Sequence, residues 1–202
     1  MTMSGGSDVE LIEKATPYDG YFQIDRYLLR HRLFDGGWSA PLSRELFERG
    51  HVVAVLPVDV LQDKVVLIEQ FRPGAYAAGW EPWLFECVAG VIEPGETAPD
   101  VARRESVEES GCELARLHHI MDYLSSPGGS SETVALFCGE VDSDRAHGVH
   151  GLDAEGEDIK VHVLGLEEAM DWLAEGRIRN AKTIIVLQWL ALNYPTLKAA
   201  WA

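Results

Sequence analysis

The chain has 202 residues, of which 47% are apolar and 25% charged, the balance of a soluble globular protein with one full hydrophobic core. Its formal net charge of −16 argues against a nucleic-acid partner, because phosphate backbones are bound by basic surfaces. No apolar run of about 18 residues is present, which argues against a membrane span.

The first ten residues, MTMSGGSDVE, lack the basic start and the apolar stretch of a signal peptide, and we expect a frayed tail there. Residues 15–49 are predicted to form strands and turns. The segment YFQIDRYLLRHRLF alternates loosely, Asp35-Gly36-Gly37 supplies a hairpin turn, and residues 43–47 continue into a second strand.

Two β-branched runs, HVVAVLPVDV and VVLIEQFR, predict strands that flank a turn at residues 62–64 and are apolar enough to lie centrally in a sheet. Residues 74–83 are predicted to form a loop. A short strand, LFECVAG, leads from this loop to residue 90.

A helix with three glutamates on one face is predicted between Pro99 and Gly111. Proline suits a first helical turn and glycine a helix end. Glu105, Glu108 and Glu109 are spaced i, i+3 and i+4, so their carboxylates share a face and repel one another unless something compensates them. Clustered oxygen ligands suit a hard divalent cation, first of all Mg²⁺. Taken alone, the pattern also fits a solvated acidic face.

The C-terminal half is predicted to add strands at HHIMDYLSS, ETVALFCGEV and IKVHVLG, with a turn at residues 127–129. A long polar loop covers residues 142–158, and loops of this length are usually functional or disordered. The segment LEEAMDWLAEG predicts an amphipathic helix, and NAKTIIVLQWLALNY a second one with Asn180 as its N-cap. Strands followed by helices at these positions indicate an α/β sandwich. Three widely spaced cysteines are expected to be reduced core thiols of a cytoplasmic protein.

The segment GVIEPGETAPDVARRESVEESGC, residues 90–112, resembles the Nudix box in the spacing of its glycines and charged residues. One position departs, because Ser106 stands where the family usually has an aliphatic residue. The strings FERGHVVAVLP, VVLIEQFR, EPWLFECVAG, SSPGGSSE, EGEDIKVHV and NAKTIIVLQWLAL, together with Pro127 sixteen residues after Gly111, are similar to the dimeric bacterial ADP-ribose pyrophosphatases of the Nudix hydrolase family. This likeness covers nearly the whole chain.

The resemblance implies the Nudix fold, an α/β/α sandwich around a mixed sheet, with an N-terminal antiparallel β extension. It implies a dimerising extension over residues 1–49, exchanged in a homodimer, and a catalytic domain over residues 50–202. The implied activity is hydrolysis of ADP-ribose to AMP and ribose 5-phosphate with Mg²⁺, or with Mn²⁺ in its place. Hydrolysis of another nucleoside diphosphate sugar is the first alternative. A non-catalytic ADP-ribose sensor is the second, which the intact glutamates disfavour.

The resemblance also assigns roles to residues. Glu105, Glu109 and Glu155 are the implied catalytic residues, with Glu155 of the AEGED segment as general base and Glu157 as the next candidate. The implied metal ligands are the Ala89 carbonyl oxygen, Glu105, Glu108, Glu109 and Glu157. Without the family pattern, the AEGED segment would also fit a disordered acidic loop.

Four residues are implied to bind substrate. Arg72 matches a phosphate-contacting arginine, Arg44 an arginine given by the partner subunit, Tyr21 an aromatic residue stacked on adenine, and Ser126 a substrate-contacting turn. Surface or core roles are the alternative for each.

Two further charged residues are expected to support the site. Arg104 is expected to orient a glutamate through a salt bridge, and Glu96 to brace the loop before the helix.

Overall fold

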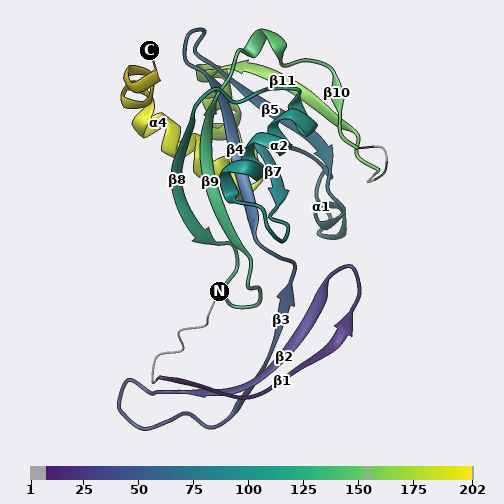
Figure 1. The fold of residues 1–202 in the computed structure, drawn as a ribbon, viewed down its shortest axis with the longest axis vertical. Helices are drawn as coiled ribbons and strands as arrows, with labels where there is room; N and C mark the ends of the chain where they lie inside the picture. Colours follow the sequence, from purple (N-terminus) through teal and green to yellow (C-terminus); the bar gives the residue numbers. More distant parts are fainter. Residues whose placement is uncertain (1–7, 153, 155, 202) are drawn as a thin grey trace. The chain divides into compact units, whose positions relative to one another are not determined.

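The computed structural model describes residues 8–152, 154 and 156–201. The chain divides into two compact units (Figure 1). The first contains the chain up to His51 together with Leu124–Thr133, and the second contains Val52–Tyr123 and the chain from Val134 onward.

The first unit is built on a three-stranded antiparallel sheet in the order β1-β2-β3. Its strands are β1 (Val9–Asp19), β2 (Gln23–His31) and β3 (Leu42–Glu48). The predicted turn lies between β2 and β3, where Gly36 and Gly37 take φ values of 90° and 80° that glycine adopts without strain. The antiparallel β extension is therefore confirmed.

The expectation of a frayed tail over the first ten residues is wrong at Val9 and Glu10, which belong to β1. Nearly all residues of β1 are exposed, so its sequence lacks the alternation that marks a strand with one buried face. The strand exists through its pairing with β2, which begins at Val9 opposite His31.

The segment Leu124–Thr133 packs within the same unit. The Phe47 N–H of β3 donates to the Gly129 carbonyl at 2.8 Å, and the Ser130 hydroxyl donates to the Phe47 carbonyl at 3.0 Å. The predicted turn over residues 127–129 is confirmed.

The second unit contains an eight-stranded mixed sheet. Its main path is β10-β11-β5-β4-β9-β8, while β6 pairs with β5 and β7 pairs with β4. The β4–β9 pair is parallel, and the pairs of β5 with β4, β6 and β11 are antiparallel. The strands are β4 (Val52–Asp59), β5 (Lys64–Phe71), β6 (Trp83–Glu86), β7 (Val88–Val91), β8 (Leu117–Leu124), β9 (Thr133–Glu140), β10 (Val149–His150) and β11 (Ile159–Gly165).

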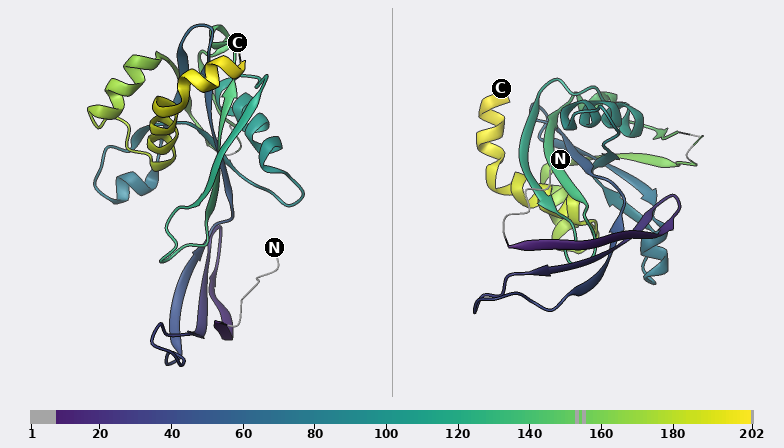
Figure 2. Two further views of the ribbon diagram at one scale, coloured as in Figure 1. Left: turned by 90° about the vertical axis from the view of Figure 1, so that its left-hand side faces the viewer. Right: turned by 60° about the horizontal axis from the view of Figure 1, so that its bottom comes forward.

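Helices cover both faces of this sheet (Figure 2). Helix α2 (Ala98–Ser110) lies on one face, and α3 (Leu166–Ala174) and α4 (Ala181–Trp201) lie on the other. This arrangement confirms the predicted α/β/α sandwich around a mixed sheet.

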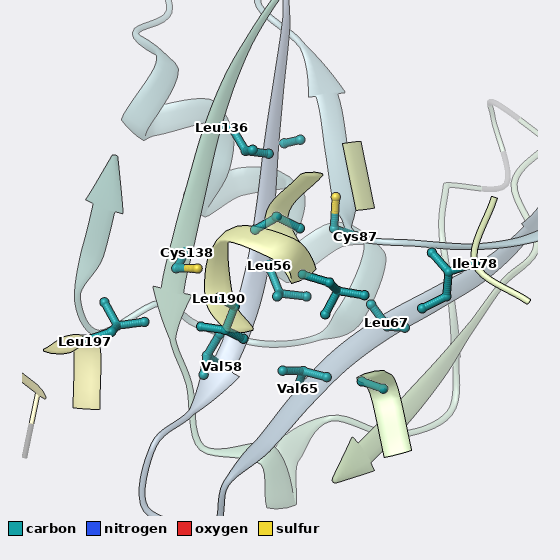
Figure 3. Packing of buried hydrophobic residues seen from close by; sticks show 14 of the residues in the cluster. Leu56, Val58, Val65, Leu67, Cys87, Leu136, Cys138, Ile178, Leu190 and Leu197 are labelled. Carbon is teal, nitrogen blue, oxygen red and sulfur yellow. The ribbon is translucent and has the colours of Figure 1, made fainter. Parts of the chain in front are cut away.

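The core of the second unit has two apolar clusters, one on each face of the sheet. Side chains alternate between the faces along a strand. Val66 and Ile68 of β5 therefore pack on the α2 side, while Val65 and Leu67 pack against α4. Figure 3 shows the cluster on the α4 side, where Leu190 meets residues of β4, β5 and β9.

Several predicted elements differ in detail. The loop predicted over residues 74–83 begins with a short helix, α1 (Pro73–Ala77), because proline stands in its first turn. The single strand predicted at LFECVAG is two strands, β6 and β7, which separate at Cys87. The N–H of this residue donates to the Thr183 hydroxyl at 2.8 Å instead of to a neighbouring strand.

The polar loop over residues 142–158 contains a 3₁₀ turn, η1 (Ser143–Arg145), and the short strand β10. The last helix has the expected cap, since Asn180 Oδ1 accepts from the Thr183 N–H at 3.3 Å. The helix continues through Pro195 to Trp201 and is therefore longer than the predicted segment, which ends at residue 194. The three cysteines are free and buried, as predicted. Within the described part of the chain, no helix is long and apolar enough to cross a membrane.

Candidate active site

Helix α2 has well-defined ends. Thr97 is its N-cap and accepts the Asp100 N–H with its hydroxyl at 3.4 Å. Gly111 ends the helix at φ 70°, with its N–H bonded to the Val107 carbonyl at 2.9 Å. The predicted glutamate helix is therefore confirmed, and it begins one residue before Pro99.

The helix lies very close to β7. A Cβ atom at Gly90 would stand 1.7 Å from Glu105 Oε1, so any other residue at this position would displace the Glu105 side chain. On the next turn, Glu109 Oε2 accepts the Ala89 N–H at 2.9 Å. Two glutamates of the box, Glu105 and Glu109, are thus packed against Ala89 and Gly90 of β7.

Arg104 lies at the centre of the box carboxylates. Its Nη1 donates to Glu105 Oε1 at 2.7 Å and to Glu108 Oε2 at 2.9 Å. Its Nε donates to Glu96 Oε1 at 2.9 Å, and the other oxygen of Glu96 accepts the Glu93 N–H at 3.0 Å. The salt bridge expected of Arg104 and the loop brace expected of Glu96 are both confirmed.

Burial makes two of these carboxylates hard to ionise. Glu109 is only 3% exposed, and its burial raises its pKa to about 8, with the Glu105 and Glu157 charges adding to the effect and the Ala89 N–H opposing it. Burial also raises the pKa of Glu105, against the lowering effect of Arg104. A bound cation would favour the ionised form of both groups.

These donors are all oxygens and are coupled electrostatically, which fits a hard divalent cation. Among the described residues, however, no three acidic, histidine or cysteine side chains are already placed to hold a metal. Each candidate instead has a protein partner; for Glu157 this is the Leu152 N–H, which donates to Oε2 at 3.1 Å. The general base candidate, Glu155, lies outside the described residues.

Arg72 is brought to the same face, where it forms an ion pair with Glu86. Arg72 Nε and Nη2 donate to Glu86 Oε1 and Oε2 at 3.1 Å and 2.8 Å. The carboxylates of Glu86, Glu109 and Glu157 raise the pKa of Arg72 against the opposing effect of its burial, which is the largest single influence. Glu86 was missed from sequence, although a lone carboxylate inside the apolar strand LFECVAG was a usable signal.

The other three candidates for substrate binding belong to the first unit. Tyr21 is 94% exposed and stands edge-on to Phe22. Arg44 is exposed, with Nη1 donating to the Ser43 carbonyl at 2.8 Å. The Ser126 carbonyl accepts the Gly129 and Ser130 N–H groups, which closes the turn at Pro127.

The box pattern implies an α/β/α sandwich. In this structure the helix that carries the box glutamates, α2, packs against β7 at Gly90. The NUDIX domain model matches residues 49–186. A crystal structure described as an ADP compounds hydrolase superposes with a TM-score of 0.67 at 19% identity, and covers 91% of this chain and 95% of that one. This second likeness supports the fold alone.

Close relatives extend over almost the whole chain. An ADP-ribose pyrophosphatase of Escherichia coli (strain K12) is 50% identical over 198 residues, which are 98% of this chain and 95% of that protein. One of Haemophilus influenzae is 46% identical over 96% of this chain and 91% of its own length. A GDP-mannose pyrophosphatase of Cronobacter sakazakii is 34% identical over 92% and 96%. The chain therefore belongs to the Nudix family, as one of its pyrophosphohydrolases.

Proposed function

We propose that this protein hydrolyses ADP-ribose to AMP and ribose 5-phosphate with Mg²⁺, or with Mn²⁺ in its place. The observation that carries the proposal is the 46–50% identity, over nearly the full chain, to the two ADP-ribose pyrophosphatases. The box glutamates that the chemistry requires are all present.

Divalent cations, when bound, polarise phosphoryl oxygens and lower the pKa of water. In our proposal, Glu105 and Glu109 hold the cations from α2, and Glu108, Glu157 and the Ala89 carbonyl oxygen complete the set. The short Gly90–Glu105 approach and the Ala89–Glu109 hydrogen bond support this assignment, because they fix two carboxylates against β7.

The attacking water must lose a proton. We assign its removal to Glu155, with Glu157 as the alternative. Arg104 is assigned the task of holding Glu105 and Glu108 in place, which its two hydrogen bonds to them support.

Four residues are assigned to substrate binding. Arg72 binds a phosphate oxygen, Tyr21 stacks on adenine, and Ser126 contacts substrate from its turn. Arg44 acts in the site of the partner subunit. The proposed domains are residues 1–49 for dimerisation and 50–202 for catalysis, and the free, buried thiols support a cytoplasmic location.

The homodimer is supported by exposed apolar side chains on β1 and on the turn between β1 and β2, which an isolated chain leaves in water. These include Val9, Leu11, Ile12, Tyr18 and Phe22. Sedimentation at micromolar concentration should give about twice the chain mass of 22.4 kDa. A fully active monomer would remove the role of Arg44 as well.

A phosphate-coupled assay on a panel of nucleotide sugars, with and without Mg²⁺, tests the substrate. We expect kcat/KM to be higher for ADP-ribose than for GDP-mannose. The reverse order would favour the alternative activity, hydrolysis of another nucleoside diphosphate sugar, which the GDP-mannose pyrophosphatase at 34% identity suggests. The classification as a pyrophosphohydrolase would still hold. ADP-ribose binding without turnover of any compound would support the sensor instead.

A further inference from the structure

The ion pair between Arg72 and Glu86 leaves one edge of the guanidinium unused. A guanidinium has five N–H groups in a rigid planar fork, and the pair engages only the edge formed by Nε and Nη2. Nη1 makes no hydrogen bond to any described residue. Three of the five N–H groups, the two on Nη1 and the second on Nη2, are therefore left for an acceptor outside the protein.

Arg72 and Glu86 are not neighbours across the paired strands, so their side chains span a long distance to form the ion pair. In the register of β5 and β6, Glu86 lies opposite Ile68, four residues before Arg72 and about 13 Å along the strand. The two side chains must therefore extend toward each other along the sheet to meet. Gln70 is 6% exposed, and its buried Nε2 has no hydrogen-bond partner among the described residues.

The surroundings of the pair also favour a role beyond stability. The Glu86 side chain is fully buried, whereas that of Arg72 is 38% exposed. Burying a carboxylate costs free energy that a single ion pair seldom recovers in full, so such pairs are weak evidence for stabilisation. The charges of Glu109, which belongs to the box, and of Glu157 favour the charged form of the same guanidinium, so the pair lies within electrostatic range of two proposed metal ligands.

We infer that Glu86 is a positioning residue, which holds the Arg72 guanidinium so that the Nη1 edge is presented to a phosphate oxygen of the substrate. The inference rests on the proposed function, which gives Arg72 the phosphate contact and gives Glu86 no role. Glu86 does not touch substrate, and its effect on the reaction passes through Arg72.

The test is a double-mutant cycle in steady-state kinetics, with wild type, Glu86→Gln, Arg72→Ala and the double variant. Glu86→Gln keeps the shape but loses one acceptor, and should lower kcat/KM by about 10- to 100-fold, mainly through KM. In the Arg72→Ala background the same change should have no further effect, because nothing remains to be positioned. An equal loss in both backgrounds, or a loss below about twofold in wild type, would overturn the inference.

Glu140→Gln is the matched control. Glu140 holds Arg116 through the same two nitrogens, Nε at 2.5 Å and Nη2 at 2.7 Å, outside the candidate site. The Glu140→Gln substitution should leave kcat/KM unchanged. A loss equal to that of Glu86→Gln would attribute both effects to the fold and overturn the inference.

Arg72→Lys keeps the test decisive if Glu86→Gln fails to fold. The single ammonium group of lysine cannot form a bidentate ion pair with Glu86 and also present further N–H donors to the substrate, so KM should rise. A wild-type KM in Arg72→Lys would contradict the positioning role. If wild type hydrolyses a different nucleoside diphosphate compound, the proposed substrate is wrong, and the same cycle on that compound still decides the role of Glu86.

Discussion

The two faces of the eight-stranded sheet use the same strands for different purposes. On the α4 side, Leu56, Leu67 and Leu190 belong to a cluster of apolar residues and thiols. On the α2 side, the apolar cluster is joined by buried groups that are costly to desolvate, including Glu86, Glu109 and the Ser106 hydroxyl, which has no hydrogen-bond partner among the described residues. We interpret this difference as a division of roles, in which the α4 face supplies stability and the α2 face gives up part of it for the chemistry proposed above.

The largest expected effect lies with the proposed general base. Glu155→Gln should lower kcat by about 10²–10⁴-fold with little change in metal requirement, because only the proton acceptor is lost. Glu109→Gln should instead weaken metal binding, since an amide is a poorer ligand for a hard cation, and added Mg²⁺ should restore part of the rate. A Mg²⁺ titration of kcat distinguishes the two.

Rescue of Glu155→Gln by metal would remove that residue from the base role. Glu157→Gln is the comparison variant, because Glu157 would then be the next candidate.

On the α4 side, a core substitution should have the opposite signature. Leu190 is fully buried, and Leu190→Ala should reduce the free energy of unfolding by about 2–5 kcal/mol through lost burial and a residual cavity. The kcat of the folded fraction should be unchanged. Urea unfolding and active-site-normalised kinetics measure the two quantities. A fall in kcat comparable to that of a box glutamate would break the division between the faces.

The buried carboxylate of Glu109 predicts a pH dependence of stability in the metal-free protein. Its folded-state pKa of about 8 lies above the ordinary value of 4.5, so the folded protein binds more protons between these values. This contribution to stability is present below pH about 4.5 and is lost as the pH rises through about 8.

The free energy of unfolding of wild type minus that of Glu109→Gln should therefore fall by a few kcal/mol as the pH rises across this window. Both values are measured by unfolding in the presence of a chelator, which keeps the proteins metal-free. A flat difference curve would show that Glu109 ionises normally.

The smallest expected effect is a gain in stability on the α2 side. The Ser106 hydroxyl is buried without a hydrogen-bond partner in the described part of the chain, and alanine is the better helix former. Ser106→Ala should therefore raise the free energy of unfolding by about 1 kcal/mol. Ser110→Ala is the control, because the Ser110 hydroxyl donates to the Ser106 carbonyl at 2.6 Å and its loss should not stabilise. Equal effects of both changes would contradict the explanation.

The sequence predicts most of this fold because its signals are local. The β-branched runs, the Gly36-Gly37 turn and the Asn180 cap each mark an element with its own residues. The first part of β1, before residue 15, was missed because this strand has no buried face. The separation of β6 from β7 was missed because it depends on Thr183, which is distant in the chain.

The candidate site was predictable to a similar degree. The box spacing predicts the shared face of the glutamates, and the structure adds what spacing does not contain. The Arg72–Glu86 pair depends on strand register, since it joins positions fourteen residues apart. The roles of Tyr21, Arg44 and Ser126 remain predictions.

The central claim is that this chain cleaves the diphosphate of ADP-ribose, and analysis of the reaction products tests it most directly. ³¹P NMR of ADP-ribose incubated with the wild-type protein and Mg²⁺ should show AMP and ribose 5-phosphate accumulating in equal amounts. Unchanged ADP-ribose, or ADP released with free ribose, would contradict the claim.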